Sequence, residues 1–537
     1  MGLFSRFKKS KLVEAQGYAT KDSLQGIFDF VRTNVDGEGR LKESGDELPD
    51  EDRRYKEDAT RWAPGAMDGT IGHHGGIRSD DAEVRRIVEL MRLISIHNGL
   101  VERTELYALL AKDNVMGFVD TVLDEVVESN ISIYPHLHTY AQWLAFKGVD
   151  RGAVKFGIAL LGVIGDEKDL DNIIILGKHE EFTLFAAVAV THTLVDAEQT
   201  LWSMAKCVYG WGRIHLVERL AGTEDVAIKA WLLRQGYKNT VMHEYLAYTC
   251  AVAGNLKEEL QRANVSDDVL HAAGDIIAAL INGGPAEDMP QYDDGAEVTQ
   301  LYVAHLEKRA NTLSDFLKLA AIKHYLESED IDWDGWEEQG WHIDLRSDLL
   351  IDLHTIITNK KWARMVLEKQ STADAEEFSE VDEAAEILGI SLWEARWRRL
   401  LANPADPDHW SSVMKNANDE RIDDIIGCAL TSLPLNEIAT GAANEIGHGE
   451  DYSLHQCMDY ILQHLGDYPG KGFDLVRTAL ESPVTRNRNL AIRVLSAWGM
   501  DHWPPETQAL LAHSGKVEPN KNTRKNIINV LSGRNPE

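Results

Sequence analysis

The chain has 537 residues and carries 87 Asp and Glu against 55 Lys and Arg, which gives a formal net charge of −32 at pH 7. This excess of acid argues against nucleic-acid binding and against wholesale attachment to anionic membranes, because both need concentrated Lys and Arg. With 44% hydrophobic and 26% charged residues, the composition is that of a folded protein, not of a disordered or fibrous one.

The first eleven residues, MGLFSRFKKSK, carry four Lys and Arg, no acid and three large apolar side chains. They lack the apolar core of a signal peptide, and Arg6 stands where a myristoylation signal has Ser or Thr. Two interpretations stay open: an amphipathic segment in weak contact with a membrane surface, and a solvated terminus. We expect residues 1–33 to contain this basic segment and a short helix.

Residues 34–78 are rich in Gly, Pro, Asp and Glu and lack helical periodicity, which predicts a linker or a loosely attached arm. A helical pattern begins at Ser79-Asp80-Asp81, which reads as a helix N-cap, and Asn98-Gly99 is a suitable helix end. Between them, apolar side chains recur at helical spacing: Val84, Ile87, Val88, Met91 and Ile94.

Beyond residue 99, helix follows helix without a convincing run of period-2 alternation. The segments IALLGVIGD and DNIIILG contain many β-branched residues and are the main candidates for strands. The first, however, continues a helical pattern from Val154, and the second shares the spacing of its neighbours. The sequence therefore predicts an all-α protein.

Internal comparison finds a recurring pattern of acidic cap, apolar pairs and small residues in three segments, 151–166, 180–196 and 223–236. A later copy, SPVTRNRNLAIRVLSAWG (482–499), follows the shorter helix GFDLVRTAL, and the pair resembles a HEAT-type helical hairpin. Since one hairpin cannot bury its own apolar face, such copies stack into a solenoid. An irregular helical bundle would give a similar pattern.

A polar, Gly- and Pro-containing segment, 281–297, indicates a second boundary. We therefore expect a helical-repeat region at 79–280, a linker at 281–297 and a second, Trp-rich helical-repeat region at 298–537.

The four cysteines, Cys207, Cys250, Cys428 and Cys457, are scattered and form no CxxC pair, so neither a disulfide framework nor a zinc ribbon is expected. This usage indicates a reducing, cytoplasmic location. The chain contains no apolar run long enough for a transmembrane helix.

Motifs that hold a redox cofactor are not found. None of the cysteines has the Phe- and Gly-bearing surroundings of a haem-thiolate ligand. GEGRLK (37–42) has only two of the glycines of a dinucleotide-binding loop and lies in the acidic linker, and GTIGHHGG (69–76) has no preceding strand. Neither a Walker sequence nor a G-x-S-x-G nucleophile elbow occurs.

Metal-ligand patterns are equally sparse. His342 and Asp344, followed by Asp352 and His354, offer a His and carboxylate combination, and Glu445 with His448 forms a single E-x-x-H pair. Chance pairs are common among 20 His and 87 acids, so we predict no metal site. His136-Leu137-His138 follows a proline and is predicted to form a turn.

The second half is dense in tryptophan: Trp333, Trp336, Trp341, Trp362, Trp393, Trp397 and Trp410. Broad aromatic surfaces suit apolar ligands, but Trp393 and Trp397, four residues apart on one helix, are more typical of helix packing. The neighbouring Arg396, Arg398 and Arg399 either meet an acidic partner or neutralise nearby acids, and we favour the second.

The segments EEFTLFAAVAVTHTLVDAEQTLWSMAKCVYGWGRIHLVERLAG and TEDVAIKAWLLRQGYKNTVMHEYLAYTCA, with GLFSRFKKSK at the start and the overall length, resemble the limonene hydroxylase family of bacilli. The resemblance implies oxidation of limonene to carveol or perillyl alcohol, further dehydrogenation to carvone or perillyl aldehyde, and NADH or NADPH as electron source. It provides no motif that assigns a catalytic or cofactor-binding residue.

Two functions therefore stand side by side. The resemblance implies a monooxygenase acting on a small apolar terpene. The residues themselves describe a cytoplasmic HEAT-like scaffold, whose usual work is to bind protein partners along a broad surface. A monooxygenase must hold haem, flavin, copper or iron, and the sequence shows no motif for any of these.

Overall fold

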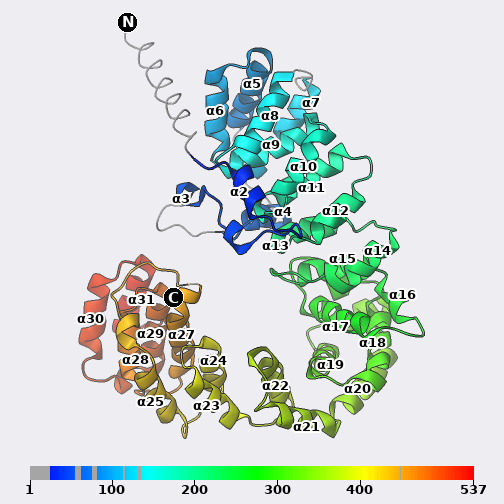
Figure 1. Cartoon of the computed structure of the whole chain (residues 1–537). Coiled ribbons are helices and arrows are strands. Elements are labelled where there is room, and N and C mark those ends of the chain that lie inside the picture. The colour runs from blue at the N-terminus through cyan, green and yellow to red at the C-terminus, as the bar shows by residue number, and fades with distance from the viewer. Residues whose placement is uncertain are drawn as a thin grey trace. The chain divides into compact units, whose positions relative to one another are not determined.

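The computed structural model describes residues 24–54, 62–74, 81–112, 115–129, 135–447 and 449–536. Helices dominate these residues, in which extended pairing is limited to two isolated bridges, Val35 with Leu41 and Glu445 with Val484 (Figure 1). The predicted all-α, HEAT-like helical-repeat class is confirmed. The two segments with the highest strand propensity lie in helices, α9 (Arg151–Ile164) and α10 (Glu167–Leu176).

The chain divides into two compact units, Met1–Asn359 and Lys360–Glu537. The first unit begins with α2 (Ile27–Asn34), α3 (Glu51–Arg54), α4 (Ala66–His74), α5 (Asp81–His97), α6 (Leu100–Leu110), α7 (Val119–Glu128) and α8 (Pro135–Lys147). After α9 and α10 come α11 (Glu180–Thr193), α12 (Glu198–Ala205), α13 (Gly210–Glu218), α14 (Val226–Trp231), α15 (Glu244–Ala253), α16 (Leu256–Leu260), α17 (Asp267–Asn282), α18 (Gly295–Arg309), α19 (Leu313–Leu326) and α20 (Ile343–Ile357). Short turns of helix lie between them: η2 (Glu43–Gly45), η3 (Val115–Gly117), η5 (Leu232–Gly236), η6 (Met289–Gln291) and η7 (Trp333–Gln339).

The second unit comprises α21 (Lys360–Lys369), α22 (Ala375–Ile387), α23 (Trp393–Ala402), α24 (Pro407–Lys415), α25 (Ile422–Ser432), α26 (Leu435–Ile438), α27 (Ser453–Leu465), α28 (Phe473–Leu480), α29 (Thr485–Trp498), α30 (Thr507–Val517) and α31 (Lys521–Leu531). The single turns η8 (Glu450–Tyr452) and η9 (Met500–His502) complete it.

Local sequence explains these helices. In α5, the predicted apolar positions Ile87, Met91 and Ile94 are fully buried, and Asn98 ends the helix with a left-handed φ of 48°. In α9, glycines permit close packing on both sides: a Cβ at Gly157 would lie 2.5 Å from the Ala145 nitrogen. Helix α9 therefore packs closely between α8 and α11.

Helices of the first unit stack in order, as a solenoid requires. Helices α9, α11, α13, α15, α17 and α19 form one layer, each packed on the next, and α16, α18 and α20 form part of a second layer (Figure 1). Because each helix contacts mainly its sequence neighbours, the core is built along the chain instead of around one centre.

Polar side chains link successive hairpins of this stack. The Tyr237 hydroxyl donates to Asp275 Oδ2 at 2.6 Å, and Lys318 Nζ lies 2.7 Å from the other oxygen of the same carboxylate. Tyr237 directly follows η5, a π-helical turn at the end of α14. These contacts join α14, α17 and α19 across two interfaces.

The second unit repeats this organisation. Helices α24, α27, α29 and α31 form one layer, while α28 packs on α25, α26 and α29, and α30 packs on α31. The predicted hairpin of GFDLVRTAL and 482–499 is α28 with α29. Its apolar face is buried as expected: Ala491, Val494, Leu495 and Trp498.

The division between the units at residue 359 differs from the expected boundary at 281–297. That segment lies within the first unit and holds η6 and the start of α18. In the predicted linker 34–78, the described residues include buried Leu48, Asp50 and Asp68, so these parts of the segment are packed. Residues 1–11, for which membrane contact was considered, lie outside the described residues.

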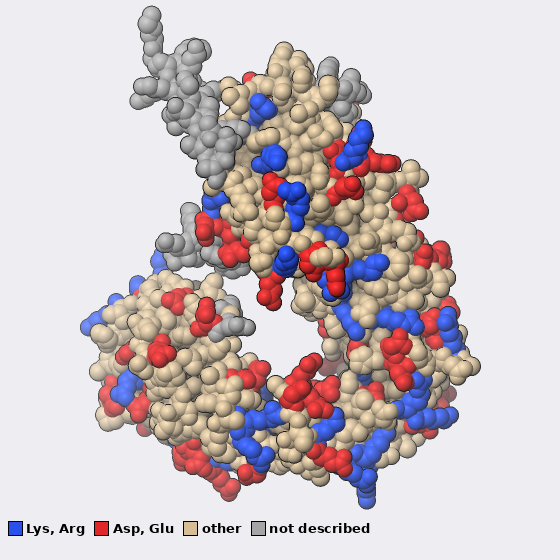
Figure 2. Space-filling view, in the orientation of Figure 1, with Lys and Arg blue, Asp and Glu red and all other residues tan. Residues whose placement is uncertain are grey.

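Acidic and basic side chains are interspersed on the face of the protein that Figure 2 presents, without a single-sign field over either unit. Within the part of the chain that the structure describes, no helix is long and apolar enough to cross a membrane.

Candidate functional site

The His and carboxylate pairs found in the sequence do not converge. His342, Asp344, Asp352 and His354 are all exposed along α20 and the residue that precedes it. Among the described residues, no group of three or more His, Cys, Asp or Glu side chains is placed to hold a metal ion. His448 lies outside those residues, so its pairing with Glu445 is not described.

The prediction of a turn at His136-Leu137-His138 is wrong, because these residues form the first turn of α8, which begins at Pro135. Nε2 of His138 lies 2.7 Å from Asp169 Oδ2, and the Gln142 amide donates to Asp169 Oδ1 at 2.7 Å. This contact ties α8 to the first turn of α10.

All four cysteines are free thiols, and Cys250, Cys428 and Cys457 are buried. Burial raises the pKa of Cys457 to about 12 and raises that of Cys250 further. Since the thiolate is the reactive and metal-binding form, these two buried cysteines act as small apolar side chains at neutral pH.

The tryptophans serve mainly as packing anchors. Trp341, Trp362 and Trp410 are almost fully buried. Trp393 and Trp397 stack with ring centroids 5.6 Å apart and planes inclined by 15°, and both pack against the core of the second unit. The helix-packing interpretation of this pair is confirmed.

The arginines beside that pair neutralise or cap neighbouring groups. Arg396 is buried and lies 2.6 Å from Asp382 and 3.2 Å from Glu386. Arg399 lies over the Phe378 ring and donates to the main-chain carbonyls of 373 and 374. Arg398 is exposed. The favoured interpretation is thus confirmed for Arg396.

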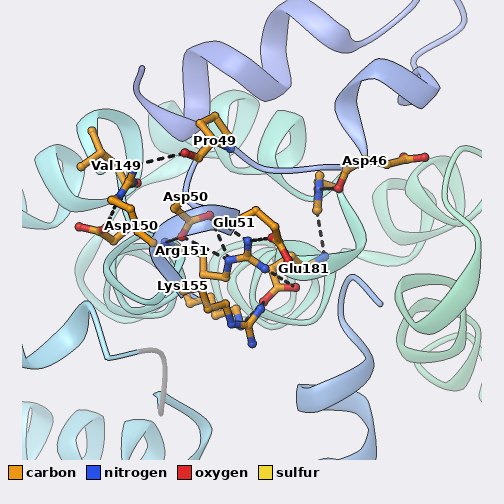
Figure 3. Close-up of polar contacts among 12 residues, drawn as sticks. Asp46, Pro49, Asp50, Glu51, Val149, Asp150, Arg151, Lys155 and Glu181 are labelled. Atoms are coloured by element: carbon orange, nitrogen blue, oxygen red, sulfur yellow. Dashed lines mark hydrogen bonds and ion pairs between the residues drawn. The ribbon is translucent and has the colours of Figure 1, made fainter. Parts of the chain in front are cut away.

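The densest cluster of buried charge was missed by sequence reasoning. It joins residues of the predicted linker to α9 and α11 (Figure 3). The Arg151 guanidinium lies 2.9 Å from Asp50 Oδ1 and also pairs with Glu51, and the Arg151 main-chain N–H donates to Asp50 Oδ2 at 2.8 Å. Glu51 and Arg151, 100 positions apart in the chain, are thereby held together.

Lys155, one turn further along α9, and Glu181 of α11 complete this cluster. Lys155 Nζ lies 2.7 Å from Asp68 Oδ2 and 2.6 Å from Glu181 Oε1, and Glu181 Oε2 accepts the Gly65 N–H at 3.0 Å. The residues labelled in Figure 3 come from the 46–51 segment, from residues 149 and 150 before α9, from α9 and from α11. The cluster fastens the arm to the solenoid.

Electrostatics favour a structural role for this cluster. Burial alone would raise the pKa of Glu181, but the charges of Lys155, Arg151 and Arg54 outweigh it and hold the pKa below its usual range. Burial lowers the pKa of His179 to about 4, so at neutral pH the ring accepts the Glu181 N–H at Nδ1 and donates from Nε2 to the Asp46 carbonyl. Within this cluster the acids and bases are paired with one another, as in a structural ion-pair network.

A cavity of about 270 Å³ adjoins this cluster and contains Glu180, whose pKa burial raises to about 7. Glu180 Oε2 accepts the Trp211 N–H at 3.0 Å, in the first turn of α13. Gly210 has a φ of 62°, and a Cβ there would lie 1.9 Å from Glu180 Oε2. The perturbed acid therefore caps a helix.

The second unit carries an open groove of about 620 Å³, here called the amide groove. Its floor is one face of α29, since Arg486, Asn489, Leu490 and Arg493 recur at helical spacing. The remaining lining residues come from the loop before η8, from α27, from the start of α29 and from the N-cap of α31: Asn444, Glu445, Ile446, Gln463, Thr485 and Asn520.

Buried polar contacts hold the walls of the amide groove. Arg488 pairs with Glu518 through two contacts of 2.8 Å and donates to the carbonyls of 482, 483 and 443. Arg486 pairs with Asp459 at 2.5 Å and reaches the Gly447 carbonyl. The loop, α29 and the segment before α31 thus form one preorganised frame.

Beneath the groove, Ser482 Oγ lies 3.1 Å from His455 Nδ1, which resembles half of a nucleophilic pair. Ser482 is fully buried and donates to Asn487 Oδ1 at 2.8 Å, and Asp459 accepts from Asn487 instead of from the imidazole. A catalytic triad needs an accessible hydroxyl and a carboxylate on the other ring nitrogen, so this network is structural.

A further groove of about 470 Å³ lies between α22, α23 and α24, where Arg396 pairs with Asp382 and Glu386. Sequence reasoning identified neither groove, because their residues read as ordinary solvated helix faces. The recurrence of Asn and Arg at 486, 489 and 493 was the one usable signal in the sequence.

No family model, curated protein or solved structure matches this chain. Limonene hydroxylase membership, the requirement for NADH or NADPH, and a cytoplasmic location stay predictions from the sequence.

Proposed function

We propose that this protein is a non-catalytic helical-repeat scaffold that binds an extended polypeptide segment of a protein partner in the amide groove. The observation that carries the proposal is Asn489, which lines the groove and whose Oδ1 is buried without a hydrogen-bond partner among the described residues. A buried acceptor without a donor costs about 1–3 kcal/mol, which an incoming N–H would relieve.

The lining chemistry suits a polypeptide main chain. Each carboxamide side chain both donates and accepts hydrogen bonds, and each peptide unit offers one donor and one acceptor. The amide groove is lined by four such side chains: Asn444, Gln463, Asn489 and Asn520. Ile446, 48% exposed, offers an apolar contact for a partner side chain.

Charge specifies the partner further. Arg493 is exposed in the groove, and no acidic side chain pairs with it among the described residues. Residues 484–537 contain eight Lys and Arg against four Asp and Glu, although the chain as a whole is strongly acidic. We therefore expect the bound segment to place a carboxylate opposite Arg493.

Rigidity of the frame supports the same function. Arg488 and Glu518 are both buried and fix the groove walls before any partner arrives. A preformed site loses less conformational entropy on binding, which favours a flexible polypeptide ligand.

The test selects peptides from a random display library on the full-length protein and measures their affinity by fluorescence anisotropy. We expect selected sequences to share an acidic residue and to lose about tenfold or more in affinity to R493E, because a charge-assisted contact becomes repulsive. N489A should weaken binding as well.

The matched control is R398E, which reverses the charge of an exposed arginine on α23 outside the groove. Its affinity for the selected peptides should equal that of the wild type. Failure to select any peptide, or equal binding by R493E and the wild type, would refute the proposal.

A further inference from the structure

A second cavity, of about 460 Å³, lies in the first unit where α17 and α19 end. Residues from the last turns of both helices line it, and η6 and η7 supply the remaining walls. Half of the lining side chains are apolar: Leu280, Ile281, Pro290, Ala321, Ile331 and Trp336. Such a cavity, with an apolar wall and a few convergent polar groups, is typical of small-molecule sites.

Two polar atoms of the lining residues are buried and have no hydrogen-bond partner among the described residues. They are Asp288 Oδ1 and the Tyr325 hydroxyl. The charge of Asp288 and burial together raise the pKa of Tyr325, with burial the larger cause, so the phenol stays protonated and lies near that carboxylate. Both atoms can accept a hydrogen bond from one donor placed in the cavity.

Asp288 is the one acidic side chain among the described residues that line the cavity. Among the described residues that line the cavity, none is Lys or Arg, and the one ionisable base, His324, is exposed. Helices of 16 and 14 residues, α17 and α19, direct their carboxyl ends toward it, and helix carboxyl ends favour cations. A positively charged guest is therefore stabilised by Asp288 and by the carboxyl end of α17, whereas the Leu326 carbonyl at the end of α19 already accepts a hydrogen bond from Arg346.

The aromatic wall is held in place by its neighbours. Trp336 meets Trp333 edge to face with ring centroids 5.5 Å apart, and Trp333 in turn contacts Tyr325 at 5.6 Å. Arg346 already lies 4.0 Å from the ring centroid of Trp333. Trp336, which lines the cavity, offers an aromatic surface to an organic cation.

Gly283 leaves room beside the Asp288 carboxylate. It has a φ of 65°, and a Cβ at this position would lie 2.9 Å from Asp288 Oδ2. The Asp288 main chain is fixed by the Gln291 side chain, which accepts its N–H at 3.1 Å. The acid is thus positioned before a ligand enters.

We propose that this cavity binds a small organic amine in its protonated form, with the ammonium donating to Asp288 Oδ1 and the Tyr325 hydroxyl and the carbon skeleton packed on Trp336, Ile281 and Ile331. This site is separate from the amide groove and does not depend on the function proposed for it. Ligands of this class carry at least two N–H donors on an apolar body of modest size.

The test titrates the full-length protein with cyclohexylmethylamine, phenethylamine and the neutral isostere cyclohexylmethanol, using calorimetry and saturation-transfer NMR. We expect saturable binding of the amines, with the alcohol weaker by about tenfold or more because it lacks the charge. D288N, which keeps the shape but removes the charge, should weaken amine binding by a similar factor, and Y325F should weaken it less.

E338Q is the matched control, since Glu338 is an exposed acid on η7 that does not line the cavity. It should bind the amines as the wild type does. Thermal unfolding of each variant without ligand detects loss of the fold. When amine is added, the unfolding midpoint should rise for the wild type and E338Q and should rise clearly less for D288N. Equal binding of amine and alcohol, unchanged binding by D288N, or no saturable binding of either amine would overturn the proposal.

Discussion

The amine of Lys155 lies 2.6 Å from Oε1 of Glu181, and both side chains are almost completely buried between α9 and α11. Lys155 also reaches Asp68 of α4, and Arg151 one turn away binds Asp50. Two buried cations thus hold a separate arm of the chain against the solenoid. Removal of one partner would leave the others charged and without compensation in a medium that solvates charge poorly.

Lys155→Met should therefore destabilise the first unit by about 3–5 kcal/mol. Hydrogen–deuterium exchange should show faster exchange in α4, α9 and α11. Lys168→Met, whose lysine is 90% exposed and pairs only at the surface, should change stability by less than about 0.5 kcal/mol. Equal protection of α9 from hydrogen exchange in both variants would show that the buried pair contributes nothing to the stability of the first unit.

Two glycines of α4 provide a second comparison within one helix. A Cβ at Gly69 would lie 2.1 Å from Cε3 of Trp211, whereas a Cβ at Gly72 would meet nothing within 4 Å. We expect Gly69→Ala to destabilise by about 1–3 kcal/mol, because the indole must move. Gly72→Ala should instead stabilise by up to about 1 kcal/mol through helix propensity. Chemical denaturation of the two variants measures the difference, and equal effects would contradict the close packing of α4 on α13.

His179 should make the first unit sensitive to acid. Burial lowers the pKa of His179 in the folded state to about 4 from an ordinary value of 6.5. Between pH 6.5 and pH 4, the imidazole is therefore protonated in the unfolded chain but neutral in the folded one. Its contribution to stability is therefore lost as the pH falls from 6.5 toward 4. Between about pH 7.5 and pH 4.5, the wild type should lose about 2.5 kcal/mol more than His179→Gln, which does not titrate.

Thermal unfolding of both proteins at the two pH values measures this difference. Both proteins also lose the stability contributed by Glu181 as the pH falls, because its pKa is lower in the folded state than in the unfolded chain. Parallel pH profiles for the wild type and His179→Gln would rule out the role given to the imidazole.

The frame of the amide groove rests on Arg488 and Glu518, which pair at 2.8 Å with both side chains buried. Arg488→Met should cost about 3–5 kcal/mol and expose α29 and α31 to hydrogen exchange. The double variant Arg488→Met/Glu518→Gln should lose less stability than the sum of the losses of the two single variants, because Glu518→Gln removes the charge that Arg488→Met leaves unpaired. Arg477→Met, which removes a surface ion pair with Asp474, is the control. If the losses of the Arg488 and Glu518 variants were strictly additive, the two residues would not be energetically coupled.

Periodicity and caps predicted the helices well, because these signals are local. The apolar positions of α5, the left-handed Asn98 and the α28–α29 hairpin are read within short windows of sequence. The same reasoning expected a boundary at 281–297, whereas the two compact units divide at residue 359, because a Gly- and Pro-containing segment can also connect helices within one unit.

The sites depend on contacts that no local window contains. Asp50 and Arg151 are 101 residues apart in the sequence. An acidic, Gly/Pro-rich segment is typical of a solvated linker, and its sequence does not show that its acids pair with distant basic side chains. Arg488 reads as an exposed cation in a repeat, yet it is buried. Asp288 and Tyr325 line one cavity only because α17 and α19 pack together and both end there.

The π-helical turn Leu232–Gly236 determines the angular setting of the residues C-terminal to it. Such a turn holds one residue more than an α-helical turn, and each residue advances a helix by about 100°. Deleting one residue there would restore regular winding but rotate Tyr237 away from Asp275, and with it from the carboxylate that Lys318 shares. The extra residue therefore sets the orientation in which Tyr237 contacts α17, and through Asp275 it affects the contact of α17 with α19.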